Sequence, residues 1–261
     1  MCELFGLNAP RPVKTNAVLK EFYARSATNP HGWGLAIGTA GALSLPEKEP
    51  VAAGKSLYLV NRLRPDICAT DMIAHIRLAT MGTVDYVNTH PFYATDAHGR
   101  RWTLAHNGTI FGAPALDRHF ALQDGSTDSE CILLELVARM SAAPDAASAE
   151  TRFGILADFA SEISRGSTPH GNKVNLLIHD GEFLYAHTNF KDSLFCATAP
   201  EGVWLCTVPL ASVRCEWRPL PFTSLCAFRA GELVRTASPH GHEYIYDPED
   251  YRTLYAAYAA L

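Results

Sequence analysis

The sequence carries little net charge and no long apolar run. Lysine and arginine number 22 and aspartate and glutamate 27, which gives a formal net charge of -5. So mild an acidic balance supplies no basic surface for nucleic acid or an anionic membrane, and we expect neither as a partner. No apolar stretch reaches the roughly 18 residues that a membrane-spanning helix needs. The first ten residues, which include Glu3, have no basic segment of a signal peptide. The sequence therefore predicts a cytoplasmic protein.

Paired cysteine motifs are also absent. The chain has seven cysteines, an odd number, and no two of them are separated by two residues. This argues against a zinc ribbon, a thioredoxin-type redox motif and the disulfide framework of a secreted protein. His240 and His242 lie close together, but no third or fourth ligand follows at a familiar spacing. We expect no metal site and no cofactor.

Composition and layout favour one globular domain. Hydrophobic residues make up 48% and charged residues 19% of the 261 residues, which is typical of a folded protein with its own core. Length by itself does not choose between one large domain and two small ones. Because no linker, repeat or low-complexity tract divides the chain, we expect a single domain over residues 1–261. Residues from about 240 to 261 are expected to form an arm or helix that packs on the body.

The hydrophobic pattern predicts strands, then helices, then strands again. The expected strands are residues 4–7, 33–37, 72–76, 102–105, 174–179, 183–187, 203–208, 225–229 and 232–236. The expected helices are residues 13–25, 55–63, 132–140 and 147–163, the third after a capping sequence at 126–130. Residues 180–181 and 230–231 stand where hairpin turns are expected. This order predicts an α+β layered sandwich of two sheets with outer helices.

Cys2 is the first residue with reaction chemistry. Removal of Met1, which generally occurs when the second residue is small, would leave Cys2 at the N-terminus. The α-amine of that residue has a pKa near ~8 and can accept the proton of its own thiol. Taken alone, a cysteine at position 2 is more simply explained as an accident.

Asn107 and Gly108 form a second candidate element. They follow an expected buried strand as a turn-forming Asn-Gly pair, and out of context they predict only a turn. In the alternative interpretation, the side-chain amide of Asn107 and the N–H of Gly108 point at one spot. Two such donors would make an oxyanion hole for a tetrahedral intermediate.

Three further residues are candidates for holding a substrate. Arg77 follows the expected strand at 72–76, and its planar guanidinium suits a substrate carboxylate; a surface arginine or an internal ion pair is an equal alternative. Asp128, at an expected helix start, either caps that helix or faces a substrate ammonium. His90 lies in a rigid turn at 88–92, where a structural hydrogen-bonding role is equally possible.

The order of these motifs resembles the class II glutamine amidotransferases, which are N-terminal-nucleophile hydrolases. The matching segments are Cys-x-x-x-Gly at 2–6, His-Gly-Trp-Gly at 31–34, His-Ile-Arg-x-x-Thr at 75–80, Asn-Thr-His-Pro-Phe at 88–92, His-Asn-Gly-Thr-Ile at 106–110 and Thr-Asp-Ser-Glu at 127–130. The likeness includes the stand-alone, single-domain bacterial members and is strong through about Glu130. Two features depart from the common pattern: the second segment lacks an Arg-Gly-x-Asp run, and Leu78 stands where many members have tryptophan.

The resemblance implies a four-layer αββα sandwich and a reaction centre. Cys2 would supply the thiol nucleophile and the α-amine base. Asn107 and the backbone of Gly108 would form the oxyanion hole.

The same resemblance implies how the substrate is held. Arg77, helped by Thr80, would bind the α-carboxylate of glutamine, and Asp128 would bind its α-ammonium. His90 and His106 belong to the same motifs and are expected to contribute to the substrate site.

The implied reaction is cleavage of a γ-amide through a γ-glutamyl thioester, which releases glutamate and ammonia or an amine. The small-molecule substrate would be glutamine or a related γ-glutamyl compound. Alternatively, the chain is a glutaminase subunit that feeds ammonia to a separate synthetase, or a non-catalytic binding protein that has kept the fold. The intact motif residues speak against the last alternative. The sequence does not separate the first two, nor does it predict the oligomeric state.

Overall fold

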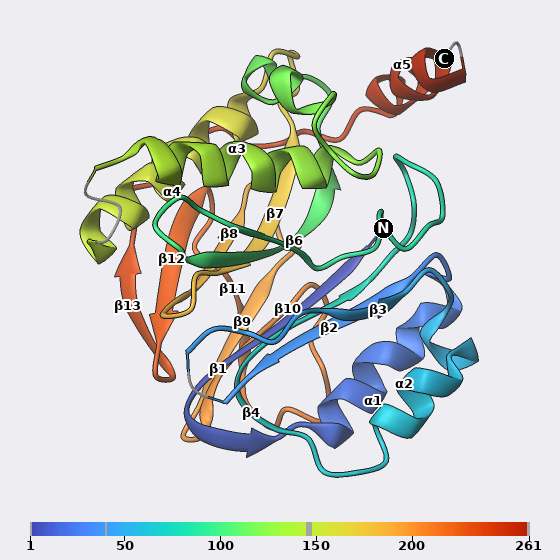
Figure 1. Ribbon diagram of the computed structural model, residues 1–261, viewed down its shortest axis with the longest axis vertical. Helices are drawn as coiled ribbons and strands as arrows, with labels where there is room; N and C mark the ends of the chain where they lie inside the picture. The colour runs from blue at the N-terminus through green and yellow to red at the C-terminus, as the bar shows by residue number, and fades with distance from the viewer. Residues whose placement is uncertain (1, 40, 145–147, 260–261) are drawn as a thin grey trace.

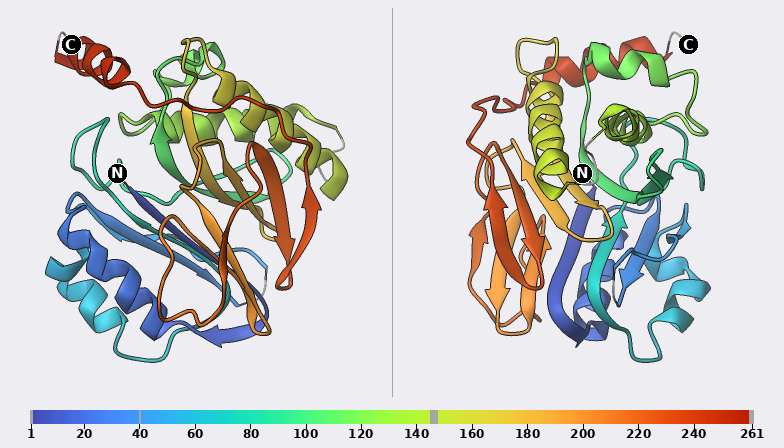
Figure 2. Two further views of the ribbon diagram at one scale, coloured as in Figure 1. Left: turned by 180° about the vertical axis from the view of Figure 1, so that it is seen from behind. Right: turned by 60° about the vertical axis from the view of Figure 1, so that its left-hand side comes forward.

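The computed structural model describes residues 2–39, 41–144 and 148–259 (Figure 1). Met1, whose removal the sequence predicts, lies outside this part of the chain. So do the first residue of the expected helix at 147–163 and the last two residues of the expected arm. In the described part, two antiparallel sheets stack face to face with helices on both outer sides (Figures 1 and 2).

One sheet has seven strands in the order β11-β9-β10-β1-β4-β2-β3. These strands are β1 (Glu3–Lys14), β2 (Trp33–Gly38), β3 (Glu47–Glu49), β4 (Cys68–Ile76), β9 (Phe195–Ala199), β10 (Gly202–Cys206) and β11 (Trp217–Pro219). The other sheet has six strands in the order β13-β12-β8-β7-β6-β5. These strands are β5 (Phe92–Thr95), β6 (Arg101–Thr109), β7 (Lys173–His179), β8 (Leu184–Thr188), β12 (Ser224–Arg229) and β13 (Glu232–Thr236).

Three apolar cores separate the layers. The helices are α1 (Asn16–Ala24), α2 (Leu57–Arg62), α3 (Asp128–Ala142) and α4 (Ala149–Arg165), with the short 3₁₀ helices η1 (Arg25–Ala27), η2 (Ala53–Lys55) and η3 (Pro114–His119). Phe22 of α1 packs on the seven-stranded sheet with Trp33, and Leu136 of α3 packs on the other sheet with Trp102. Leu4 belongs to a third core between the sheets. This arrangement confirms the αββα sandwich that the sequence and its resemblance predict.

Strand β1 is longer than predicted. It runs from Glu3 to Lys14 instead of ending at Leu7. The expected stop at residues 8–10 is wrong because the pairing with β4 shifts between Asn8 and Val13, and Pro10 lies in that irregular stretch. A proline is tolerated there because no regular ladder hydrogen bond is required of it. β1 therefore lies in the middle of its sheet, between β10 and β4.

Local signals explain the elements that were predicted well. The side chain of Thr127 accepts a hydrogen bond from the N–H of Glu130 (3.3 Å) and starts α3, as the capping sequence indicates. Residues 180–181 and 230–231 do connect paired strands, β7 with β8 and β12 with β13. Four strands, β3, β5, β9 and β11, were not predicted. They are three to five residues long and lie at or next to a sheet edge, where neighbours decide the structure more than sequence does.

The C-terminal arm begins on the body and ends away from it. The N–H of Tyr244 donates to the carbonyl of Asn189 (2.8 Å), and the Tyr244 side chain is buried. Helix α5 (Pro248–Ala259) then projects from one corner of the molecule (Figures 1 and 2). Of the helices that the structure describes, none combines the length and apolarity needed to cross a membrane.

Candidate active site

Cys2 lies at the entrance to the central strand β1. The next residues are fixed on both sides, because Glu3 is paired with Ile76 of β4 and the N–H of Leu4 donates to Oγ1 of Thr207 (3.2 Å). The Cys2 Sγ atom lies 3.3 Å from both the backbone nitrogen and the carbonyl oxygen of Leu78. The thiol position is thus determined by backbone contacts of a sheet.

The electrostatic environment keeps the Cys2 thiol protonated. Burial raises its pKa above the ordinary value of a cysteine, and this outweighs the opposing effects of the Leu78 hydrogen bond and the Arg77 charge. A thiol with a raised pKa is a poor nucleophile at neutral pH unless a base removes its proton. For Cys2 to act as a nucleophile, a base would therefore have to lie close to Sγ.

Asn107 and Gly108 belong to a strand, so the turn interpretation is wrong. Strand β6 does not end at Ala105 but continues to Thr109, because β7 pairs with it along this whole length. The side chains alternate across β6, as Ala105 packs between the two sheets and Leu104 packs toward α3. Asn107 shares the face of Ala105, and lies with Cys2 at the edge of a common hollow.

The N–H of Gly108 points away from β7. Gly108 is opposite Val174, but the Val174 N–H donates to the Asn189 side chain (2.8 Å). The two residues therefore form the non-hydrogen-bonded kind of antiparallel pair. Strand β5 occupies the other side of β6 only as far as Leu104, so the Gly108 N–H faces the open side near Cys2.

Glycine is required at position 108. A Cβ atom there would lie 1.8 Å from the carbonyl oxygen of Lys173 and 2.2 Å from Nε2 of His106. Backbone and a buried ring are both too close for any side chain. Gly108 thus has two effects: its N–H faces Cys2, and its lack of a side chain allows β6 and β7 to lie close together.

Seven of the eight site residues predicted from sequence line one narrow hollow. They are Cys2, Arg77, Thr80, His90, His106, Gly108 and Asp128, and Asn107 lines an adjoining hollow together with Cys2, Thr80 and Gly108. Cys2 directly precedes β1, and Arg77, Thr80 and His90 lie in the connection between β4 and β5; the others belong to β6 and to the start of α3. The narrow hollow has a volume of about 20 Å³, which is space for about one water.

Arg77 is buried and holds the loop that follows it. Its guanidinium donates to the carbonyl oxygens of Met81 (2.8 Å), Gly82 (3.4 Å) and Thr83 (2.8 Å). Burial lowers the pKa of Arg77, while the nearby Cys2 and Asp128 groups oppose this. Because the side chain is buried and donates to carbonyls, and pairs with no carboxylate of the described residues, the surface and ion-pair alternatives are both wrong. Three of the five donors of a guanidinium are occupied in this way.

The two residues before β2 hold the residues that directly follow β4. The N–H of His31 donates to the Arg77 carbonyl (3.0 Å), and the Arg77 N–H donates to the Gly32 carbonyl (2.8 Å). His31 Nδ1 accepts the N–H of Ala79 (3.0 Å). The glycine-rich second motif therefore positions the arginine motif.

Asp128 does not cap its own helix, since Thr127 does. The Asp128 carboxylate accepts hydrogen bonds from the N–H of Ile110 (2.8 Å) and from the hydroxyl of Ser129 (3.2 Å), which ties α3 to the end of β6.

His106 is held at both ring nitrogens, by Ser129 Oγ (3.0 Å) and by the Lys173 carbonyl (3.2 Å). Burial lowers the pKa of His106, so its ring is neutral near pH 7.

His90 does not make structural hydrogen bonds to the described residues. Neither of its ring nitrogens has a hydrogen-bond partner in that part of the chain, and the same holds for His75. The two rings lie 4.3 Å apart between centroids, and burial lowers the pKa of each. His90 thus enters the site as a neutral, buried ring beside Cys2.

A sequence model of the class-II glutamine amidotransferases matches residues 1–204. The chain belongs to this family.

Two relatives and two solved structures show the range of the likeness. An uncharacterised protein of Methanocaldococcus jannaschii is 31% identical, over 90% of this chain and 71% of the relative. A protein of Escherichia coli that is provisionally named a glutamine amidotransferase is 31% identical, over 78% and 79%. A protein of Pseudomonas aeruginosa described as a predicted glutamine amidotransferase has a TM-score of 0.59 at 21% identity, over 90% of this chain and 100% of that one. A glutamine phosphoribosylpyrophosphate amidotransferase from B. subtilis has a TM-score of 0.66 at 14% identity, over 93% of this chain. The present chain spans 50% of that protein, and identities this low establish the fold alone.

Sequence reasoning missed Lys173 as a residue beside Cys2. It is the first residue of β7, only 1% exposed, and lines two of the hollows that contain Cys2. Its Nζ lies 3.4 Å from Oδ1 of Asn107 and 5.1 Å from the ring centre of Phe190. Burial lowers the pKa of Lys173 to about 8. A lysine at a strand start is usually solvated, so nothing local to the sequence indicated this position.

A second, larger hollow opens on the other side of Cys2. Its volume is about 430 Å³, and it shares Cys2 and Leu78 with the narrow hollow. The remaining lining residues are Glu3, Thr28, Asn29, Asn107, Lys173, Phe190, Asp192, Ser193, Thr207 and Val208. The thiol therefore borders two hollows of very different volume, the narrow one and the larger one.

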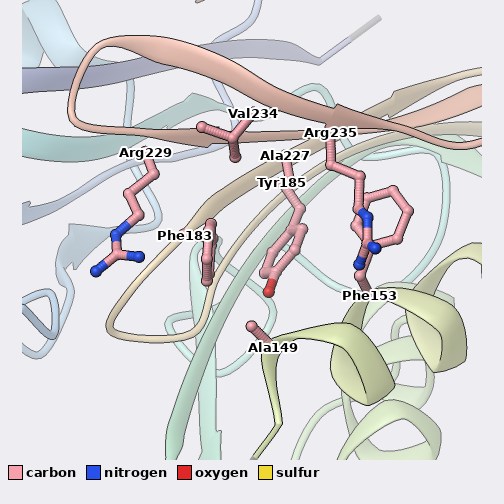
Figure 3. A pocket seen from close by; sticks show the side chains of 8 residues that line it. All are labelled: Ala149, Phe153, Phe183, Tyr185, Ala227, Arg229, Val234 and Arg235. Atoms are coloured by element: carbon pink, nitrogen blue, oxygen red, sulfur yellow. The ribbon is translucent and has the colours of Figure 1, made fainter.

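A third hollow lies away from Cys2, between α4 and strands β8, β12 and β13 (Figure 3). Its volume is about 340 Å³, and its lining is mainly aromatic and aliphatic, with Arg229 and Arg235 at its edge. Both arginines are ion-paired, with Glu182 and Glu150. None of the predicted site residues takes part, so this hollow is separate from those that contain Cys2.

No metal centre is evident in the part of the chain that the structure describes. No three histidine, cysteine, aspartate or glutamate side chains gather there closely enough to hold a metal ion. His240, noted in the sequence with His242, has its Nε2 atom 2.9 Å from Nε2 of His187.

Proposed function

We propose that the chain is a cysteine-nucleophile amidohydrolase that cleaves the γ-amide of glutamine or of a related γ-glutamyl compound. The observation that carries the proposal is the meeting of Cys2, at the start of a central strand, with the donors Asn107 and Gly108 in one hollow. All seven cysteines are free thiols in the structure, which supports a reducing, cytoplasmic location. Both sheets draw strands from distant parts of the chain, which supports a single catalytic domain.

The first half of the reaction is acylation. After Met1 is removed, the α-amine of Cys2 accepts the thiol proton and Sγ attacks the γ-carbonyl carbon. The Asn107 amide and the Gly108 N–H stabilise the oxyanion of the tetrahedral intermediate. Its collapse breaks the C–N bond, and the leaving nitrogen takes the proton back from the α-ammonium.

The second half is hydrolysis of the thioester. Water attacks the γ-glutamyl carbonyl, the α-amine accepts the water proton, and the proton passes to the leaving thiolate. Glutamate departs and the free thiol is restored. The raised pKa of Cys2 is consistent with this cycle, because the resting enzyme holds a neutral thiol and amine instead of a thiolate.

The narrow hollow is where we place the glutamyl head group. Two donors of Arg77 remain for the α-carboxylate, and the Asp128 carboxylate faces the α-ammonium, with Thr80 alongside. His90 and His106 form the neutral wall of this side. Because the hollow has a volume of only about 20 Å³, the loop held by Arg77 must shift when substrate enters.

The nucleophile is tested with Cys2→Ala. This variant should release no glutamate from glutamine or from γ-glutamyl amides, and should not be labelled by a chloroketone analogue of glutamine. Cys68→Ala is the matched control, because Cys68 is exposed at the opposite end of β4. Labelling that persists in Cys2→Ala would show that another thiol reacts and would overturn the proposal.

A further inference from the structure

The two hollows beside Cys2 differ greatly in size. If the glutamyl head group occupies the narrow one, the leaving nitrogen points into the larger one, which has a volume of about 430 Å³. Ammonia is about the size of a water molecule and occupies roughly 30 Å³. A hollow of this volume falls in the range of sites for whole small molecules. The leaving-group side is therefore far larger than ammonia requires.

The positive charge of this hollow lies at its inner end, which we define as the part next to Cys2 and Asn107. Among the described residues that line it, Lys173 is the one cation, and its Nζ lies beside the Asn107 side chain. Of the two carboxylates, Glu3 is paired with Arg25 (3.0 Å), and Asp192 is exposed. An anionic group on the substrate would thus be attracted to the inner end of the hollow, next to the reacting atoms.

The position of Lys173 is fixed by its neighbours. Its carbonyl oxygen lies 3.2 Å from Nε2 of His106 and can accept the N–H of that ring, and its strand position is opposite Thr109. The preceding Asn172 is bound through its side chain to Phe111 (2.7 Å) and to the Ile163 carbonyl (2.7 Å). An ammonium held in place in a buried site binds a carboxylate more strongly than a flexible surface lysine does.

Resting on the function proposed above, we propose that the larger hollow is a leaving-group subsite for an amine that carries a carboxylate, and that Lys173 recognises this carboxylate. The substrates are then γ-glutamyl amides of amino acids or peptides, in preference to glutamine. In γ-glutamylglycine the carboxylate is attached to the carbon next to the scissile nitrogen. It therefore lies close to the atoms that react, as Nζ of Lys173 does.

The proposal is tested with a matched pair of substrates. γ-Glutamylglycine and γ-glutamylglycinamide have nearly the same size, but only the first has a carboxylate. In the wild-type enzyme kcat/KM for glutamate release should be roughly 10- to 100-fold higher for the first, the range expected of a charged hydrogen bond. Lys173→Met should reduce this ratio to near one. Lys191→Met is the control, because Lys191 is exposed on the neighbouring loop and does not line the hollow, and it should keep the ratio.

The ratio separates substrate recognition from a role in positioning Asn107. If Lys173 only orients Asn107, Lys173→Met lowers kcat/KM for both amides and for glutamine equally, and the unchanged ratio overturns the proposal. A wild-type enzyme without preference for the carboxylate overturns it as well, while hydrolysis of glutamine leaves the proposed function standing. If glutamate is released neither from the two γ-glutamyl amides nor from glutamine, both proposals are overturned. If Lys173→Met does not fold, Lys173→Gln carries the same prediction.

Discussion

Replacing Asn107 by alanine tests the proposed oxyanion hole. The change removes one of two donors and leaves the backbone N–H of Gly108 in place. Loss of one preorganised donor lowers kcat by about 10²–10³-fold, or roughly 2.7–4 kcal/mol. The donor acts mainly in the transition state, so KM and the affinity for glutamate should change little.

The structure also sets the expected effect on stability. Within the described part of the chain, the Asn107 side chain makes one hydrogen bond, which is the long one donated by Lys173 (3.4 Å). Its loss should lower the free energy of unfolding by no more than about 0.5–1.5 kcal/mol. A large loss of activity with a small loss of stability is therefore the signature of a catalytic donor.

Asn8→Ala is the matched control for a buried asparagine on a strand. Asn8 donates to Asp71 (2.7 Å) and accepts the N–H of Gly231 (2.8 Å), and it lies six residues along β1 from Cys2, or about 20 Å. This variant should lose roughly 1–3 kcal/mol of stability and keep its kcat when folded. The assays are glutamate release, glutamate binding by calorimetry, and thermal unfolding. An Asn107→Ala enzyme with wild-type kcat, or equal activity losses in the two variants, would refute the oxyanion assignment.

Two further predictions concern the N-terminus and the head-group hollow. Active protein should begin at Cys2 by intact-mass analysis, because with Met1 attached the base becomes a peptide nitrogen that cannot accept a proton; full activity of a protein that retains Met1 would contradict the mechanism. Arg77→Lys keeps the charge but loses the planar fork, and Asp128→Asn removes the partner of the α-ammonium, so each should raise KM for free glutamine by roughly 10- to 100-fold. Unchanged KM values in both folded variants would exclude these residues from the head-group site.

The sequence predicted which residues lie together better than it predicted their local structure. Cys2, Arg77 and Asp128 were placed correctly near the ends of apolar elements, because hydrophobic runs and a capping sequence mark those ends. Asn107 and Gly108 were expected to turn the chain, and instead they continue β6. The reason is non-local: β7 begins more than sixty residues later and pairs with them.

The alternatives left open for single residues were decided by tertiary contacts. Nothing near Arg77 in sequence indicates that its guanidinium binds the carbonyls of its own following loop. Asp128 was a possible helix cap, but Thr127 takes that role and leaves the Asp128 carboxylate to Ile110. Lys173 was overlooked because its burial results from Asn107 across the sheet and from Phe190 in another loop. Burial of this kind is not encoded in the residues beside it.

The location of β1 has a consequence for how the enzyme matures during synthesis. β1 precedes the other strands of the described chain, yet one of its two neighbours, β10, comes much later, since Phe5 is paired with Cys206. The ribosome must therefore add roughly two hundred residues before this side of the sheet can close, and contacts so distant in sequence form slowly. If Met1 is removed, as the proposed mechanism requires, an aminopeptidase has this interval in which to act. On the proposed mechanism, exposure of the Cys2 amine and assembly of the surrounding hollow are thus separate events, and a chain stopped before β10 would carry Cys2 without the complete hollow.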